Sequence, residues 1–311
     1  MIRLDFKKLS IAVFGDYCLD EYLWVDAALN EPSLETDLIA YQCTKREVYS
    51  GAAGTVAKNL ANLAVGTVYA IGYVGDDGRG IDLCRALDDL KINRENLIIA
   101  KDRVTPTYTK PWYTENGKTR ELNRIDTKNW TPTSRELEDA ALNNLRNLIG
   151  KIDALIILDQ MTEENCGIVT TRVRAELAAI ARENPDLLVY ADSRSRIRLF
   201  EDMIIKGNQF EIPLELCEGH AKPVIRTMGE EGVAIYSDGE RIKVPAIPVS
   251  GQTDVCGAGD MFTASFVSAL SAGVSLEEAG RLGNIAASIC VTQLGTSGYV
   301  TVDDLMKSIQ G

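Results

Sequence analysis

This 311-residue sequence has a single histidine, and none of its cysteines lie close together in the sequence. Because His220 is its only histidine, histidine-based catalytic triads and multi-histidine metal sites are disfavoured, and a general base should be a carboxylate. The seven cysteines are scattered and form no C-x-x-C pair. Such a set indicates reduced thiols in a cytoplasmic protein, and neither a disulfide framework nor a zinc site.

Long apolar runs and an excess of basic residues are also missing. Stretches such as Ala154–Leu158 are far shorter than the ~18 residues that indicate a membrane span, and the first ten residues lack the apolar core of a secretory signal. The 33 Lys and Arg residues face 45 Asp and Glu residues, which gives a formal net charge of −12. This balance argues against a nucleic-acid partner. It does not exclude binding of a small anionic substrate, provided that a few basic residues converge in one place.

Short apolar runs alternate with amphipathic helical patterns along most of the chain. The runs that predict buried strands are 10–14, 68–74, 154–158, 187–191 and 224–228. The spacings that predict helices cover 53–64, 81–90, 135–148, 165–181, 258–272 and 276–294. This alternation predicts an α/β fold with a mostly parallel sheet and helices on both faces, formed by residues 1–311 as a single domain.

Two segments, 38–48 and 105–125, break this alternation. Both are rich in Thr, Tyr and Val with alternating polarity, and the second contains Asn116-Gly117, a strong signal for a two-residue hairpin turn. We expect them to form a small antiparallel β sheet beside the main one. It would serve as a lid that closes over a ligand or as a clasp between two copies of the chain, and a plain surface hairpin is the alternative.

The segment 254–260 directly precedes a predicted helix. Its small residues Gly257, Ala258 and Gly259 let backbone N–H groups approach an anion at the positive end of the helix. Because a carboxylate repels phosphate, Asp260 makes most sense as a base that accepts a proton from a hydroxyl attacking that phosphate. At an ordinary pKa of about 4 it would be ionised at neutral pH. Capping of the helix by Asp260 is the alternative.

Three further segments could contribute polar groups to a site. Asn208 and Glu211 could share one face of a first helical turn and hold Mg²⁺ through water, although this spacing alone is a weak signal. The glycine-bearing turn 227–232 could approach a nucleotide or be a simple β-turn. Asp16 and Asp20 follow the first strand, where carboxylates can accept hydrogen bonds from sugar hydroxyls. Neither a P-loop nor a G-x-G-x-x-G fingerprint is present.

Taken in order, these segments resemble the ribokinase-like (phosphofructokinase-B type) carbohydrate kinases over nearly the whole chain. The matching segments are 15–20, 51–59, 74–78, 208–211, 227–232 and 254–260. Within that family, the motifs GDYCLDEY, LNRID and QLGTSG look most like the heptose-phosphate kinase branch. The resemblance implies a ribokinase-like, doubly wound fold and a kinase that uses ATP and Mg²⁺ to phosphorylate a sugar or sugar phosphate. It leaves open a requirement for a monovalent cation and a homodimer formed through the lid.

The resemblance also implies roles for individual residues. Asp260 would be the general base, and the backbone amides of Gly257, Ala258 and Gly259 would form the anion hole. The acceptor sugar would be bound by Asp16, Asp20, Gly51, Ala52, Thr55 and Asp254, with Thr55 standing where the family usually carries Asn. The nucleotide would be bound by Asn208, Arg194 (or Arg196), Thr227, Gly229, Gly232 and Asn284. Mg²⁺ would be held by Asn208 and Glu211.

Other classes of function remain to be weighed against the kinase. The chain could be a catalytically silent ligand-binding or regulatory protein that kept the fold, since a fold does not by itself fix a function. A nicotinamide-dependent oxidoreductase is disfavoured because the dinucleotide fingerprint is missing. Release of ADP from ATP and Mg²⁺ in the presence of sugars or sugar phosphates separates the enzyme from the regulator.

Overall fold

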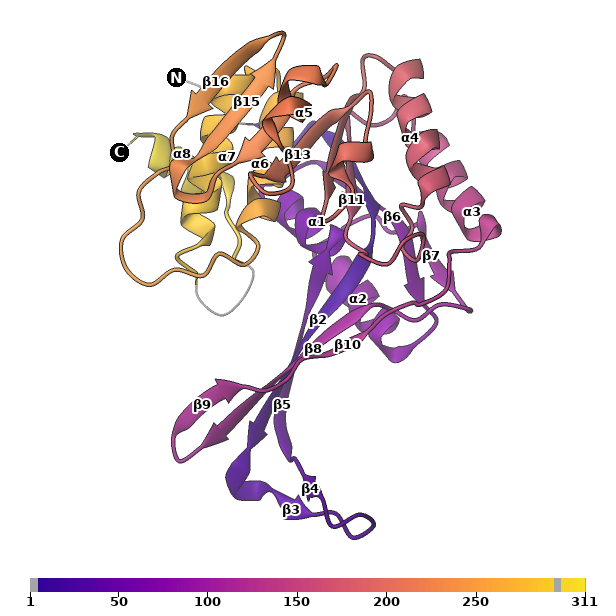
Figure 1. Cartoon of the computed structure of the whole chain (residues 1–311), viewed down its shortest axis with the longest axis vertical. Coiled ribbons are helices and arrows are strands. Elements are labelled where there is room, and N and C mark those ends of the chain that lie inside the picture. The colour runs from indigo at the N-terminus through magenta and orange to yellow at the C-terminus, as the bar shows by residue number, and fades with distance from the viewer. Residues whose placement is uncertain (1–4, 294–297, 311) are drawn as a thin grey trace.

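The computed structural model describes residues 5–293 and 298–310 (Figure 1). A nine-stranded main sheet contains β1 (Ser10–Gly15), β6 (Thr67–Gly75), β7 (Leu97–Ala100), β11 (Ala154–Asp159), β12 (Leu188–Ser193), β13 (Ile204–Asn208), β14 (Val224–Thr227), β15 (Val233–Ser237) and β16 (Glu240–Val244). Their spatial order is β16-β15-β14-β13-β12-β11-β1-β6-β7. The strands from β14 to β7 pair in parallel, and β15 and β16 add an antiparallel edge. The mostly parallel sheet predicted from the sequence is therefore confirmed.

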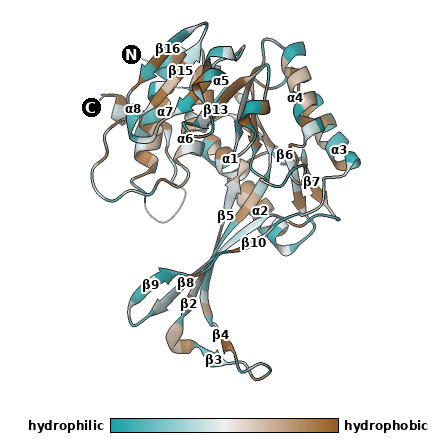
Figure 2. Cartoon of the chain, in the orientation of Figure 1, coloured by the Kyte–Doolittle hydropathy of each residue, from teal (hydrophilic) through white to brown (hydrophobic). Residues whose placement is uncertain are grey.

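Helices cover both faces of this sheet. One face carries α1 (Ala53–Asn62), α2 (Gly78–Asp89), α6 (Ala258–Ser271), α7 (Leu276–Cys290) and α8 (Val302–Gln310), and the other carries α3 (Arg135–Arg146), α4 (Thr171–Glu183) and α5 (Leu214–Gly219). Consecutive strand side chains point to opposite faces, so Val13 packs in one apolar core and Phe14 in the other. Figure 2 shows hydrophobic colour on β7 and hydrophilic patches on α3 and α4.

A second sheet projects from the body of the molecule (Figure 1), and we call it the lid. It contains β2 (Tyr17–Asp26), β5 (Cys43–Ala52), β8 (Thr107–Glu115), β9 (Lys118–Glu121) and β10 (Ile125–Thr127). The short 3₁₀ helix η1 (Ala27–Leu29) and the hairpin of β3 (Glu31–Pro32) and β4 (Ile39–Ala40) join β2 to β5. Strands expected at 38–48 and 105–125 are thus confirmed. The sheet is mixed and not antiparallel, because β2, a strand that was not predicted from the sequence, pairs in parallel with β8.

The Asn116-Gly117 turn between β8 and β9 is also confirmed. Glu115 pairs with Lys118, and both turn residues have positive φ angles, 50° and 74°, as a tight hairpin requires. The fourth predicted helix begins at Thr171 and not at 165, because the Thr170 side chain caps it by accepting the Val173 N–H. Most of the QLGTSG motif, residues 294–297, lies outside the described residues.

Within residues 5–293 and 298–310, no helix is both long enough and apolar enough to span a membrane.

Candidate active site

The N-terminus of α6 is the centre of the candidate site. Gly257, in the left-handed conformation at φ 78°, precedes the helix, and Asp260 lies in its first turn. The Ala258 amide makes a 3.3 Å bond to the Val255 carbonyl, whereas no hydrogen bond from the Gly257 or Gly259 amide is recorded within residues 5–293 and 298–310. Two of the three amides expected to form an anion hole are therefore available to a ligand.

The electrostatic surroundings of Asp260 differ from those expected for an exposed carboxylate. Burial raises the pKa of Asp260 to about 7, and the charges of Asp192 and Asp20 raise it further, while Lys206 and Lys58 act in the opposite direction. The expected pKa of about 4 was therefore wrong, because burial and through-space charges cannot be read from local sequence. A proton acceptor with a pKa near neutrality is well matched to general-base catalysis at neutral pH.

Lys206, on β13, lies directly beneath this turn. Its Nζ forms a 2.6 Å ion pair with Asp192 of β12, and both side chains are buried. A Cβ atom built on Gly259 would lie 3.0 Å from the Lys206 Nζ, so the glycine leaves room for the ammonium group to approach the helix. Lys206 was not predicted from the sequence, although a lone lysine inside the apolar strand Ile204–Asn208 indicates that it has a specific partner.

The base of the lid holds Asp20, one of the residues predicted to bind the acceptor. Asp20, on β2, accepts a 2.9 Å hydrogen bond from Lys110 of β8, which also contacts the Tyr22 hydroxyl at 3.2 Å. A Cβ on Gly51 would lie only 2.8 Å from a carboxylate oxygen of Asp20, so glycine is needed for this close approach. The charges of Asp20 and Lys110 both reach Cys256, which places the pair next to the turn before α6. Lys110 and Lys58 were also missed by sequence analysis.

Asp16 does not belong to the acceptor side, and this expectation is corrected. Its carboxylate is 4% exposed and accepts the backbone N–H groups of Gln160, Met161 and Ile168 at 2.8–3.0 Å. Burial raises its pKa to about 6. Asp16 therefore holds the loop after β11 against the start of the lid, a structural role that the sequence pattern could not distinguish from sugar binding.

Thr55 is corrected for a similar reason, since its buried hydroxyl donates to the Ser50 carbonyl at 2.9 Å. Ala52 lies just before α1 with a positive φ of 50°, a strained conformation for a residue with a side chain. The Asp254 carboxylate accepts the Cys256 N–H at 2.9 Å and so shapes the turn that leads to α6. These contacts assign Thr55 to the interior, and Asp254 to the turn that leads into α6.

A cavity of about 620 Å³ lies between β14, the segment after β16, α6 and α7, where several residues predicted to bind the nucleotide are found. Four of the predicted residues line it, namely Thr227, Gly229, Gly232 and Asn284, together with Ala258 and Gly259 of the α6 turn. Gly229 and Gly232 have positive φ angles, and a Cβ on Gly232 would lie 2.3 Å from the Val244 carbonyl oxygen. The structure thus brings these four residues to one cavity with Ala258 and Gly259 of the proposed anion hole.

Asn208 and Glu211 lie in a turn and not in a helix, which corrects the expected first helical turn. The Asn208 Oδ1 accepts the Phe210 and Glu211 N–H groups, and the Glu211 carboxylate accepts the Asn208 N–H at 2.7 Å. One Glu211 oxygen has no recorded bond in the described ranges. The charge of Glu211 reaches Lys206, so this carboxylate faces the same edge of the sheet as the α6 turn.

This donor set fits a magnesium ion that is held mainly by water and phosphate. Among the described residues, no cluster of three His, Cys, Asp or Glu side chains could hold a metal ion by itself. Hard oxygen ligands suit Mg²⁺, which usually keeps several waters and uses only one or two carboxylates beside substrate phosphates. Asn208 and Glu211 are therefore compatible with the predicted role.

The two arginines after β12 differ. The Arg196 guanidinium is fully engaged within the protein. It forms a 2.7 Å ion pair with the buried Asp159 and donates hydrogen bonds to the Met161 and Thr162 carbonyls. The expectation that it could contact phosphate is corrected. Arg194 is exposed, and its charge reaches Tyr108 of the lid, so it remains a candidate ligand-binding residue.

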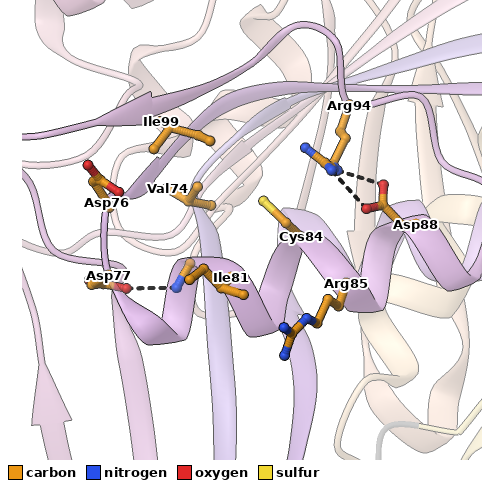
Figure 3. A pocket seen from close by; sticks show the side chains of 11 residues that line it. Val74, Asp76, Asp77, Ile81, Cys84, Arg85, Asp88, Arg94 and Ile99 are labelled. Carbon is orange, nitrogen blue, oxygen red and sulfur yellow. Dashed lines mark hydrogen bonds and ion pairs between the residues drawn. The ribbon is translucent and has the colours of Figure 1, made fainter.

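A smaller cavity of about 300 Å³ lies between β7 and α2 (Figure 3). Arg94 and Asp88 form an ion pair at one end, and Asp77 accepts the Gly80 N–H at 2.7 Å. These groups are already paired with one another, and none of the predicted site residues lines this cavity.

Known proteins resemble this chain in sequence and in fold. It is 28% identical over 98% of its length to a bifunctional protein HldE of Bradyrhizobium diazoefficiens, and 26% identical over 95% to that of Sulfurimonas denitrificans. The chain spans only 65% and 63% of these relatives. Arabidopsis thaliana ribokinase complexed with ribose and ATP superposes with a TM-score of 0.71 at 18% identity, covering 97% of this chain and 99% of that one. Escherichia coli phosphofructokinase-2 in complex with potassium gives a TM-score of 0.71 at 20% identity, covering 96% and 97%.

The family model described as pfkB family carbohydrate kinase matches residues 10–301, which is nearly the whole chain. The resemblance drawn from the ordered motifs is confirmed by this match, and the ribokinase-like fold by the superpositions. This chain accordingly belongs to the pfkB family of carbohydrate kinases, phosphotransferases whose acceptor is an alcohol group.

Proposed function

We propose that the chain is a cytoplasmic ATP-dependent kinase that transfers the γ-phosphoryl group to a hydroxyl of a sugar or sugar phosphate, with Asp260 as the general base. The observation that carries the proposal is the position of Asp260, in the first turn of α6 between the lid and the 620 Å³ cavity, with its pKa raised to about 7. All seven cysteines are free thiols, as expected in a reducing compartment.

In this mechanism the protein contributes positioning and charge. The acceptor hydroxyl gives its proton to the Asp260 carboxylate while its oxygen forms the new bond to phosphorus, and the bond to the ADP oxygen breaks. Negative charge on the transferred group is met by the Gly257 and Gly259 amides and by the nearby Lys206 ammonium. Asn208 and Glu211 would hold Mg²⁺, which neutralises phosphate charge when bound.

Acceptor recognition is assigned to the base of the lid and not to its tip. Asp20 can accept hydrogen bonds from sugar hydroxyls, while Lys110 and Lys58 add positive charge beside it. The whole chain has a net charge of −12, but Lys110 and Lys58 form a local basic cluster. An anionic acceptor such as a sugar phosphate needs such a cluster. The hairpin of β8 and β9 lies away from the body of the molecule in Figure 1, so the lid residues nearest Asp260 are those at its base.

A second copy of the chain is the partner that we assign to the outer lid. Trp24 and Trp112 stack with ring centroids 5.7 Å apart, and Tyr22 meets Tyr49 edge to face at 5.7 Å. Strand alternation puts these rings on the same face as Lys110, whereas Tyr113, on the opposite face, already contacts Tyr41. An aromatic face on a single sheet is best buried by a second layer, and a twofold axis would supply the same face from another copy.

The test of the kinase function is ADP release from ATP and Mg²⁺ with a panel of sugars and sugar phosphates. Release with at least one acceptor is expected, and Asp260→Asn should lower that turnover by at least ~100-fold while nucleotide binding persists. Asp238→Asn, in an exposed turn between β15 and β16, is the matched control and should keep full activity. Nucleotide binding without release across the panel would indicate a silent regulator, and near-normal turnover of Asp260→Asn would remove Asp260 as the base.

A further inference from the structure

The lid has two faces at its base, and the one that points away from Asp260 is bound to α2. Asp20 and Glu21 are consecutive on β2, so their side chains point to opposite faces of the sheet. The charge of Asp20 reaches Asp260 of α6. Glu21 is 6% exposed and lies on the other face, where Arg79 of α2 approaches it. α2 and α6 therefore lie on opposite sides of the base of the lid.

Two ion pairs cross from α2 to the lid. The Arg46 Nη2 of β5 lies 2.7 Å from the Asp82 Oδ2, and the Arg79 Nη2 lies 3.5 Å from the Glu21 Oε2. Arg79 also donates to the Thr127 hydroxyl of β10 at 3.1 Å. Because Arg79 and Asp82 are three residues apart, they share one face of α2. This face binds three strands of the lid, β2, β5 and β10, with charges of both signs.

Each carboxylate in these pairs has a second partner on its own side of the contact. Glu21 also forms a 2.7 Å ion pair with Arg46 inside the lid and accepts the Thr109 hydroxyl at 2.7 Å. Burial alone would raise the pKa of Glu21, but these two hydrogen bonds hold it below its ordinary value, so the group stays ionised. On α2, the Arg85 Nη1 lies 3.9 Å from the other oxygen of Asp82. Separation of the lid from α2 would therefore leave neither carboxylate without a cation.

The contact between Arg46 and Asp82 can also separate into water. Their side chains are 42% and 20% exposed, so both charges can be solvated when they part. A fully buried pair differs, because breaking it leaves an uncompensated charge in the interior. Within residues 5–293 and 298–310, no ion pair joins the lid to α6 or α7, and both pairs with a helix are made with α2. Ion pairs therefore hold the lid from one side, and they can be released.

We propose that the Arg46–Asp82 and Arg79–Glu21 pairs form a latch that holds the lid in the position shown in Figure 1 and opposes its closure toward α6. Because α2 and α6 lie on opposite sides of the lid, movement toward α6 lengthens both pairs. Closure of such an element over a bound ligand excludes water from the site. The latch acts in the unliganded chain, so it sets the fraction of closed molecules whatever reaction the site performs.

The length of the lid makes a small rotation measurable. β8 has nine residues, which at ~3.3 Å per residue give a lever about 30 Å long. A rotation of about 10° at its root would move the hairpin of β8 and β9 by about 5 Å, since displacement grows with the length of the lever. Because half-exposed ion pairs contribute modestly to stability, loss of one should raise the closed fraction about 3-fold.

The test is double electron–electron resonance on the unliganded protein. Spin labels are carried by unnatural amino acids at two exposed positions, Lys118 of β9 and Glu277 of α7, and labelled chains are diluted into unlabelled protein so that distances within one chain dominate. Asp82→Asn should raise the population at the shorter distance about 3-fold. Asp88→Asn is the matched control, because Asp88 is also on α2 but pairs with Arg94, which is not in the lid.

Salt distinguishes the latch from a general loosening of α2. At 0.5 M sodium chloride the wild-type distances should approach those of Asp82→Asn, while the distances of the variant should change little. Identical distances in the wild-type protein and Asp82→Asn would overturn the latch, and so would an equal shift in Asp82→Asn and Asp88→Asn. ADP release by the wild-type protein is a separate measurement, so a failure of the kinase function would leave the latch standing.

Discussion

The Lys206 Nζ lies 2.6 Å from the Asp192 Oδ2, and the two residues are register partners on the adjacent parallel strands β13 and β12. This buried pair lies beneath the first turn of α6 and acts on Asp260 in opposite senses. Lys206 lowers the pKa of Asp260, whereas Asp192 raises it. The proton affinity of the proposed base is therefore set by a balance between two neighbouring strands of the main sheet.

The first prediction concerns the pH dependence of turnover. Because burial raises the pKa of Asp260 to about 7, the base is protonated below that pH and cannot accept the proton of the acceptor hydroxyl. We expect kcat/KM to fall about tenfold per pH unit below pH ~6.5 and to level off above pH ~7.5. Steady-state rates between pH 5 and 9 test this, and a flat profile down to pH 5 would contradict it.

The second prediction separates the two members of the buried pair. Lys206→Met should move the acidic limb of the profile to higher pH, since the attractive charge is removed, and Asp192→Asn should move it to lower pH. Both variants leave a buried charge without its partner, so both should also lose about 3–5 kcal/mol of unfolding free energy. The pH displacement, measured in folded protein, is the informative readout. Displacement of both profiles in one direction would refute the assignment.

The third prediction tests whether the lid base recognises the acceptor. Lys110→Met removes the 2.9 Å bond to Asp20 and should raise the KM for the acceptor at least about 10-fold, with the KM for ATP unchanged. Lys118→Met, at the far hairpin, is the control and should leave both constants unchanged. Equal effects of the two substitutions would mean that the whole lid, and not its base, determines acceptor affinity.

Asp16 provides a fourth prediction, which concerns stability. Its pKa is about 6 in the folded chain, above its ordinary value, so the folded state binds the proton more tightly and loses stability as pH rises from about 4 to 6. The stability difference between the wild-type protein and Asp16→Asn should shrink by about 2 kcal/mol over that range, as measured by urea denaturation. The acceptor KM of Asp16→Asn should stay within about twofold of wild type, whereas a large increase would restore Asp16 to the sugar site.

The fifth prediction addresses assembly. Trp112→Glu places a charge on the aromatic face of the lid and should convert a dimer into a monomer in analytical ultracentrifugation. Trp130→Glu is the control, because Trp130 is 71% exposed and lies outside the lid. Should both variants and the wild-type protein sediment alike, the lid face would not be the contact between copies.

The sequence allowed the order of strands and helices to be predicted where apolar periodicity is strong. Runs such as 154–158 and 224–228 are nearly continuous, because both faces of a parallel strand are covered. β2 was missed because Asp20, Glu21 and other polar residues interrupt its apolar pattern. Asp20 and Glu21 form ion pairs with Lys110 and Arg46 in the lid.

The glycines of the candidate site could be selected from the sequence because their backbone conformation matters. Glycines at 257, 229 and 232 adopt conformations that other residues rarely accept, so their pattern is visible in the sequence. Lys58, Lys110 and Lys206 were missed because each comes from a different element, and their convergence exists only in three dimensions. The same reason explains why Asp16 and Asp20, four residues apart, have different partners: Asp16 accepts three backbone N–H groups, and Asp20 pairs with Lys110.

The connection between core and lid has a mechanical consequence. Only Asp16 separates β1 from β2, and β5 runs directly into α1, so both ends of this lid ribbon enter the body without a flexible linker. Any movement of the outer lid must bend or twist a continuous pair of strands that are pinned at their root by Asp16 and its three backbone donors. Bending this strand pair costs elastic energy. A displaced lid therefore returns to its starting position when the force on it is released.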